Sequence, residues 1–233
     1  MRCHFIQHAH FETPGSLSAW AVKHNLKIAL YHPYQNDPLP VVTQGEPVIF
    51  LGGPQSATEY QRYAYLEKEV TYIRELVKLK QPMVGICLGA QLIGESLGAK
   101  CLRSPEKEVG VFPIKLTEKA KHHPYFKGLP QTQPVMHWHN DMPGLTKSAN
   151  VLATSEGCPR QIIEYAPNIL GFQCHFEAND EWLGLLLENA SNDLKPSRFT
   201  QSVEAMHKSD FKAMNLYLET ILDRWFQAST SLT

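Results

Sequence analysis

The sequence predicts an α/β fold with a mostly parallel sheet and helices on both of its faces. In the first hundred residues, short apolar runs typical of buried strands alternate with segments whose apolar residues recur at helical spacing. This alternation is typical of strand–helix–strand units, in which a helix crosses one face of the sheet between two parallel strands. Two expected strands end in turns that contain glycine, at 52–54 and 85–89, at the edge where open parallel sheets bind ligands.

The first part of the chain is expected to form short strands separated by helices. The expected strands are residues 3–8, 26–31, 47–51 and 82–86, and the expected helices are residues 17–24, 59–80 and 88–97. In the helix at 59–80, one face carries Leu66, Val70, Ile73 and Val77, which predicts that this face packs on the sheet.

Beyond residue 100 the apolar runs become shorter, and a helical region follows them. The runs at 109–116, 151–154 and 161–164 are expected strands with some antiparallel pairing, and helices are expected at 181–190, 199–207 and 211–226. Residues 178–233 are too few to form a separate domain. We therefore expect a single domain over residues 1–233, with 178–233 packed on it as a helical C-terminal extension.

Composition argues against several classes of partner. The chain has 22 basic and 23 acidic residues and no run of Lys or Arg, which argues against a nucleic-acid partner. No apolar window is long enough for a membrane span, and residues 1–8 lack the apolar stretch of a signal peptide. The five cysteines are scattered and form no CxxC pair, which predicts reduced thiols and a cytoplasmic protein.

A cysteine lies where the expected strand at 82–86 meets the following helix. Gly85 and Gly89 flank Cys87, and small neighbours let the backbone turn tightly, as around the serine of a nucleophile elbow. The helix N-terminus favours a thiolate, and the N–H of Leu88 is placed to stabilise an oxyanion beside it. The turn at 52–54 can bring a second glycine N–H to the same point. The alternative is a buried structural cysteine beside packing glycines.

A second polar group follows another expected strand, in the segment 171–177. Side chains two residues apart share one face of an extended chain, so His175 and Glu177 can lie side by side. A carboxylate beside an imidazole fixes its tautomer and stabilises the imidazolium that forms when the ring takes a thiol proton. We therefore interpret Cys87 as a nucleophile and His175 as its base. The alternative for this histidine is a hydrogen-bonded residue at a strand edge.

Four segments give the chain a family resemblance. They are Gly-Gly-Pro at 52–54, Gly-Ile-Cys-Leu-Gly-Ala-Gln at 85–91, His-Trp-His-Asn-Asp at 137–141 and Gln-Cys-His-Phe-Glu at 173–177. In this order they resemble the class I (triad) glutamine amidotransferase domains, particularly those of GMP synthases and their stand-alone relatives. The resemblance implies a flavodoxin-like, doubly wound sheet.

The resemblance also implies roles for individual residues. It implies a catalytic triad of Cys87, His175 and Glu177, with the N–H groups of Gly53 and Leu88 as the oxyanion hole. The residues implied in substrate binding are Gly52, Gln91, His139, Asn140 and Asp141, the last three bordering the amino-acid end of glutamine.

Two positions depart from the family pattern. Phe176 stands where family members usually have proline, between the histidine and the glutamate of the triad. Trp138 stands where the synthase domains often have serine, and an indole there narrows or reshapes the pocket.

No metal or cofactor is expected from the sequence. His137 and His139 are two residues apart, but no cysteine or carboxylate at ligand spacing completes a metal site beside them.

Three functions remain open at this point. The first is hydrolysis of the γ-amide of glutamine, with ammonia either passed to a separate accepting subunit or released by a free-standing hydrolase. The second is a γ-glutamyl peptidase that cleaves γ-glutamyl amides with a larger leaving amine, an interpretation that Trp138 favours. The third is a non-catalytic binding or regulatory module that keeps the fold. The small-molecule substrate in the first two is glutamine or a γ-glutamyl compound.

Overall fold

The computed structural model describes residues 1–230 and has a ten-stranded mixed sheet. The strands are β1 (Arg2–Ile6), β2 (Lys27–Tyr31), β3 (Val48–Phe50), β4 (Met83–Ile86), β5 (Leu102–Leu116), β6 (Thr132–Met142), β7 (Asn150–Thr154), β8 (Ile162–Ala166), β9 (Ile169–Phe172) and β10 (Phe199–Thr200). Their order is β10-β5-β7-β8-β9-β4-β3-β1-β2, and β6 pairs with β5 outside this path. Within this order, neighbouring strands are parallel in the part that contains β9, β4, β3, β1 and β2. The strands β8, β7, β5 and β6 join this part by antiparallel pairing.

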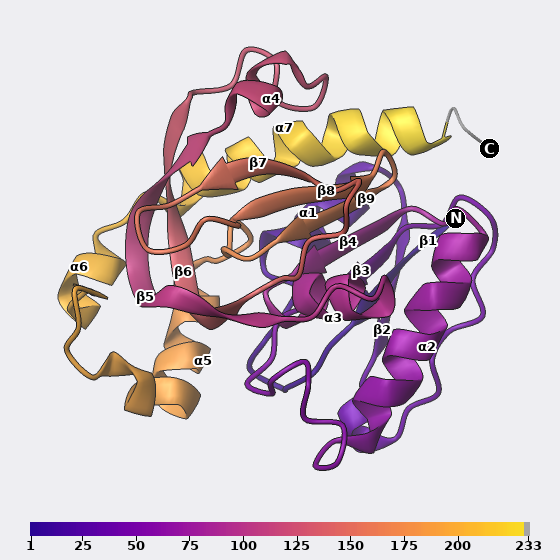
Figure 1. Ribbon diagram of the computed structural model, residues 1–233, viewed down its shortest axis with the longest axis horizontal. Helices are drawn as coiled ribbons and strands as arrows, with labels where there is room; N and C mark the ends of the chain where they lie inside the picture. The colour runs from indigo at the N-terminus through magenta and orange to yellow at the C-terminus, as the bar shows by residue number, and fades with distance from the viewer. Residues whose placement is uncertain (231–233) are drawn as a thin grey trace.

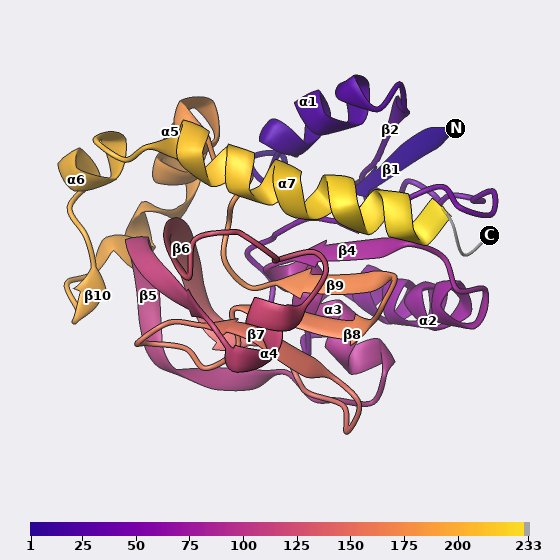
Figure 2. The same ribbon diagram turned by 90° about the horizontal axis from the view of Figure 1, so that it is seen from above.

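Helices cover both faces of this sheet (Figure 1). They are α1 (Ser16–Lys23), α2 (Ala64–Lys78), α3 (Leu88–Ser96), α4 (Glu118–His122), α5 (Asp180–Ala190), α6 (Val203–His207) and α7 (Phe211–Thr230), with short 3-10 turns η1 (Pro33–Gln35) and η2 (Ser191–Leu194). Figure 2 shows α1 and α7 on one side of β4 and α2 and α3 on the other. The predicted α/β fold, with a mostly parallel sheet and a helical C-terminal region, is confirmed.

Apolar side chains fill both interfaces between helices and sheet. On one face, Leu66, Val70 and Ile73 of α2 are buried against the sheet and α3, as their spacing predicts. On the other face, Trp182 of α5 and Trp225 of α7 are fully buried. Burying a large apolar side chain stabilises a fold by about 1.5–3 kcal/mol. The C-terminal helices are therefore part of the core that supports the sheet.

Three segments differ from the sequence predictions. The helix predicted at 59–80 begins only at Ala64. The helix predicted at 199–207 begins at Val203, because Phe199 and Thr200 pair with β5 as the short strand β10. The sequence predicts no strand at 132–142, yet this segment is β6. Its centre is buried, but its histidines and tryptophan do not give the aliphatic run or strict alternation that marks a strand.

None of the helices among residues 1–230 is both long enough and apolar enough to span a lipid bilayer. All five cysteines are free thiols. Burial raises the pKa of the Cys3, Cys158 and Cys174 thiols, which keeps them protonated and poorly nucleophilic.

Candidate active site

Cys87 occupies a strained turn between β4 and α3. Its backbone angles are φ 49° and ψ −107°, in the positive-φ region that residues with a side chain rarely adopt. Its N–H donates a 2.7 Å hydrogen bond to the carbonyl of Phe172 at the end of β9, which holds the turn against the neighbouring strand. Strain of this kind, in a strand–turn–helix context, is typical of a nucleophile elbow.

Two glycines let the helix after Cys87 lie directly on the strands. A Cβ atom on Gly85 would lie 2.5 Å from the backbone nitrogen of Ala90, and one on Gly89 would lie 2.2 Å from the carbonyl oxygen of Phe50. Both distances are too short for a real side chain. The sequence prediction that small residues are needed at this turn therefore has a direct steric basis.

Leu88 and Gly53, the two residues expected to form the oxyanion hole, lie in contact. Leu88 is the first residue of α3, so its N–H has no acceptor within the helix. A Cβ atom on Gly53 would lie 2.8 Å from Cδ2 of Leu88. The segment after β3 and the start of α3 therefore meet beside Cys87.

His175 and Glu177 form a buried pair in the segment that follows β9. Nδ1 of His175 lies 2.7 Å from Oε1 of Glu177, and the backbone N–H of His175 bonds to the carbonyl of Met136 in β6. Nε2 of His175 is buried and has no hydrogen-bond partner among the described residues. Burial opposes a positive charge on this ring, but attraction to Glu177 and to the Cys87 sulfur raises its pKa well above the usual value.

The Cys87 sulfur also contacts groups that the sequence does not single out. Nε2 of Gln173 lies 3.3 Å from Sγ, and the carbonyl oxygen of Trp138 lies 3.9 Å from it. Gln91, expected to bind substrate, lines the pocket beside Cys87 and donates from its amide to Oε1 of Gln173 at 3.0 Å. The chain from Gln91 through Gln173 therefore orients an amide N–H toward the sulfur, where it would stabilise a thiolate.

Cys87 opens into a pocket of about 260 Å³. This is just below the roughly 300–1,000 Å³ of pockets for drug-sized ligands, so its size suits a molecule comparable to an amino acid. The lining residues are Phe11, Glu12, Gly53, Pro54, Gln55, Ser56, Glu59, Cys87, Gln91, Arg103, Val109, Trp138, His139, Asn140, Asp141, Leu186, Ala190 and Asp193.

The expected substrate-binding residues are distributed unevenly around this pocket. Asn140 and Asp141 line it together with Arg103 of β5, whose guanidinium lies 3.2 Å from Oδ1 of Asn140 and 3.5 Å from Oδ1 of Asp141. Gly52 is not among the lining residues, and its carbonyl is bonded to Nδ1 of His8 at 3.1 Å. No motif or periodicity in the sequence singles out Arg103, so only the folded chain shows that it lines the pocket.

A family model, "Glutamine amidotransferase class-I", matches residues 19–185, well over half of the chain. The chain belongs to the class I glutamine amidotransferase family. The matched region includes the Cys87 turn and the His175–Glu177 pair, so the geometry described above lies within the family domain. The family relationship predicted from the four sequence segments is therefore confirmed.

Two proteins match this chain over nearly its whole length. The glutamine amidotransferase-like protein YfeJ of Salmonella typhimurium is 40% identical, with 96% of each chain covered. The crystal structure of SMU.1228c has a TM-score of 0.91 and 38% identity, covering 97% of this chain and 99% of that one. The GMP synthase [glutamine-hydrolyzing] of Lactococcus lactis is 33% identical over 56% of this chain but only 24% of its own length, so it is a distant relative.

Phe176, which replaces the proline usual in the family, anchors the segment that carries His175 and Glu177. Its ring stacks on Tyr217 of α7 with 5.3 Å between centroids and an angle of 2°, and it meets the edge of Phe172. Residues 176–177 form a turn rather than the extended chain that the sequence predicts, and His175 and Glu177, on either side of Phe176, bond to each other. The C-terminal helix thus supplies the rigidity that a proline gives elsewhere.

Glu12 places a further buried carboxyl group at the wall of the pocket. A Cβ atom on Gly52 would lie 2.7 Å from Oε2 of Glu12 and 3.2 Å from Cε1 of His175, so all three residues are neighbours. Burial raises the pKa of Glu12 to about 7; His175 and His8 oppose this rise and Glu177 adds to it. Glu12 lies in a loop after β1 without any motif, and only the folded chain reveals its position.

Replacing Glu12 with Gln is expected to change how stability depends on pH. The folded chain holds this proton more tightly than an exposed glutamate of pKa 4.5, so the wild type loses stability as the pH rises from 4.5 to about 7. Glu12→Gln removes this loss and should raise the free energy of unfolding by up to about 3 kcal/mol at alkaline pH, with little change at acid pH. Urea unfolding of both proteins at acid and at alkaline pH measures this difference. The same dependence of stability on pH in the two proteins would contradict a raised pKa of the buried Glu12 carboxyl group.

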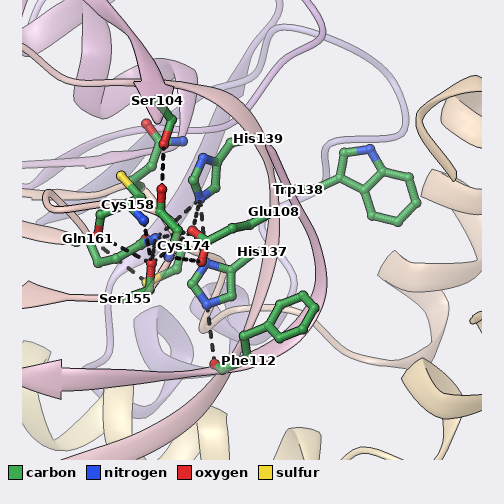
Figure 3. Close-up of polar contacts among 12 residues, drawn as sticks. Ser104, Glu108, Phe112, His137, Trp138, His139, Ser155, Cys158, Gln161 and Cys174 are labelled. Atoms are coloured by element: carbon green, nitrogen blue, oxygen red, sulfur yellow. Dashed lines mark hydrogen bonds and ion pairs between the residues drawn. The ribbon is translucent and has the colours of Figure 1, made fainter. Parts of the chain in front are cut away.

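Behind the pocket wall, Glu108 of β5 meets His137 and His139 of β6 in a buried cluster (Figure 3). Burial opposes the negative charge of Glu108, but a hydrogen bond from His139 and attraction to both histidines lower its pKa. Burial lowers the pKa of His137 to about 3, so this ring is neutral near pH 7. His139 was expected at the amino-acid end of the substrate; its ring points into the cluster, while Trp138 points to the opposite side of the strand (Figure 3).

Proposed function

We propose that this amidotransferase hydrolyses the γ-amide of glutamine through a thioester on Cys87. His175 accepts the thiol proton at Nε2, and Glu177 holds the ring through Nδ1. The observation that carries the proposal is the 2.7 Å bond between His175 and Glu177, which leaves Nε2 without a partner beside a cysteine in a strained turn. A base with one nitrogen fixed and the other free is the arrangement that activates a thiol.

The reaction follows from these positions. The Cys87 thiolate attacks the side-chain carbonyl carbon of glutamine, and the N–H groups of Gly53 and Leu88 stabilise the oxyanion. One such donor is worth about 3 kcal/mol of barrier. The imidazolium of His175 returns its proton to the leaving nitrogen, and ammonia departs. Water, deprotonated by His175, then attacks the γ-glutamyl thioester, which releases glutamate and restores the thiol.

The polar end of the pocket supports recognition of an amino acid. The guanidinium of Arg103 can pair with the α-carboxylate of the substrate, and the carboxylate of Asp141 can pair with its α-ammonium group. These two oppositely charged side chains lie in one pocket with Cys87. A substrate without an α-carboxylate and an α-ammonium group would need neither of them.

The decisive experiment measures ammonia release from glutamine and amine release from γ-glutamyl dipeptides by the wild type and by Cys87→Ser. Turnover in the wild type and its loss in Cys87→Ser are expected, with Cys101→Ser as a matched control that retains activity. A glutamine analogue carrying an electrophile should label Cys87. If neither substrate class turns over and no label is found, the chain is a non-catalytic binding module.

A γ-glutamyl peptidase is the second candidate, because part of the pocket is apolar. Phe11, Trp138 and Leu186 line it, and the Trp138 indole is fixed by a 3.0 Å hydrogen bond to Asp193. An apolar wall of this kind suits a leaving amine larger than ammonia.

Trp138→Ser is expected to shift the preference between the two substrate classes. If the indole contacts the leaving amine, the variant should lose about 10-fold or more in kcat/KM for γ-glutamyl dipeptides with an apolar second residue, relative to glutamine. Parallel measurements on both substrates give this ratio directly. An unchanged ratio would show that Trp138 only shapes the wall, and would leave glutamine as the substrate to pursue.

A further inference from the structure

Three side-chain atoms that can each bind a metal ion converge in the cluster behind the pocket. Oε2 of Glu108 lies 3.2 Å from Nε2 of His139 and 3.5 Å from Nδ1 of His137, and these two nitrogens are 3.4 Å apart. In a tetrahedral zinc site with bonds of roughly 2.0–2.1 Å, neighbouring ligand atoms are about 3.3–3.4 Å apart. The triangle in this chain therefore has the dimensions of one face of a zinc tetrahedron (Figure 3).

The tautomer of His137 is fixed by a bond on the far side of its ring. Nε2 of His137 lies 3.2 Å from the carbonyl oxygen of Phe112, which can only accept, so the proton is on Nε2 (Figure 3). Nδ1 of the neutral ring then turns a lone pair toward Glu108 and His139. A second hydrogen bond of this kind is the usual support of a metal-binding histidine.

Among these three atoms, only Nε2 of His139 can carry a proton that links them. Because Glu108 and Nδ1 of His137 are both acceptors, the N–H on Nε2 of His139 is the one donor between them. Nδ1 of His139, on the other side of that ring, is buried without a hydrogen-bond partner among the described residues. A divalent cation would replace this single N–H as the link among the three atoms, with the His139 proton on Nδ1.

The carboxylate of Glu108 is held in place by neighbouring residues. Ser155 donates to its Oε2 at 2.9 Å, and Gln161 donates to the same atom at 2.7 Å. Nε2 of Gln161 is also 3.3 Å from Nε2 of His139, while its Oε1 is buried without a partner in the described chain. Gln161 therefore supports the carboxylate as a hydrogen-bond donor.

We propose that Glu108, His137 and His139 bind a zinc ion as three ligands of a tetrahedral site. Two imidazoles and a carboxylate in a small tetrahedral space match zinc better than magnesium or calcium, which prefer six or more oxygen ligands. The ion would join β5 to β6 and fix the peptide of Trp138, whose carbonyl lies beside the Cys87 sulfur. This revises the expectation of no metal, because Glu108 is distant in sequence and reaches the histidines only through strand pairing.

The test uses Cys87→Ser protein, so that zinc cannot bind the nucleophile and the result is independent of the proposed hydrolysis. Chelator-treated protein is titrated with zinc against a chromophoric chelator, and with Co²⁺ as a spectroscopic probe. We expect one ion per chain, micromolar or tighter, with the absorption of tetrahedral cobalt and no thiolate charge-transfer band. No stoichiometric binding, or a thiolate band, would overturn the proposal.

Two substitutions locate the ion. His137→Gln and Glu108→Gln should each weaken zinc binding by at least about 100-fold, since removal of even a supporting group costs 10–100-fold. His123→Gln is the matched control, because His123 also pairs with a glutamate, Glu164 at 2.9 Å, and should bind zinc normally. Circular dichroism checks folding. Unchanged affinity in both cluster variants would refute the site, and if neither folds, the cobalt spectrum of the Cys87→Ser protein decides.

Discussion

His175→Gln is expected to lower kcat for γ-glutamyl hydrolysis by about 10³-fold or more. The proposed reaction needs Nε2 of His175 twice, first as the base for Cys87 and then as the acid for the leaving nitrogen. Positioned acid–base groups contribute about 10²–10⁴-fold, and a triad acts as a unit, so loss of its base removes most of the contribution. The glutamine side chain introduced at position 175 fills a similar volume to the imidazole but cannot accept and return a proton. The measurement is kcat for ammonia release at saturating substrate.

A second readout separates chemistry from folding. The rate at which iodoacetamide alkylates Cys87 at neutral pH should fall in His175→Gln, because the imidazolium no longer stabilises the thiolate. His24→Gln is a matched control: His24 pairs with Asp223 at 2.7 Å, neither residue lines the pocket, and its loss should leave both rates unchanged. Wild-type kcat in His175→Gln would refute the proposed triad.

Glu177→Gln tests the other half of the pair. The carboxylate of Glu177 is the main attraction that raises the pKa of His175, whose buried ring would otherwise resist protonation. A neutral amide keeps a hydrogen bond but removes the charge, so the pKa of His175 should fall. We therefore expect the pH profile of Cys87 alkylation to lose its plateau at neutral pH, because less of the thiol exists as a thiolate–imidazolium pair.

The parts of the site that local sequence determines could be predicted. The turn at Cys87 depends on Gly85 and Gly89, which are within two residues of it. His175 pairs with Glu177 only two residues further on, although through a turn and not through the extended chain that the sequence predicts. Both are short-range properties of the chain. The strands and helices of the first hundred residues were predictable for the same reason, since each has its own apolar period.

The contacts that the sequence did not reveal all come from distant segments. Gln173 reaches the Cys87 sulfur only because β9 lies beside β4, and Glu108 meets the two histidines only because β5 pairs with β6. Glu12 approaches His175 through the loop that follows β1. No periodicity encodes these contacts, because they depend on strand order and register, and β6 itself lacks an apolar pattern.

Gly89→Ala is expected to lower the free energy of unfolding by about 3 kcal/mol or more. The new methyl group would lie 2.2 Å from the carbonyl oxygen of Phe50 and 2.7 Å from its Cβ, so α3 must move away from β3. Overpacking of a tight core costs about 1–3 kcal/mol when side chains can adjust, and here the obstacle is backbone. Urea unfolding gives the change, and thermal unfolding should show a lower midpoint.

Gly184→Ala in α5 isolates the steric cause. Both glycines lie within helices, but no atom lies within 4 Å of a Cβ built on Gly184. Alanine is favoured over glycine in helices by about 1 kcal/mol, so Gly184→Ala should be neutral or stabilising. If the two variants behave alike, close contact at Gly89 is not what holds α3 to the sheet. If they diverge as expected, displacement of α3 should also slow the reaction, since the N–H of Leu88 moves with it.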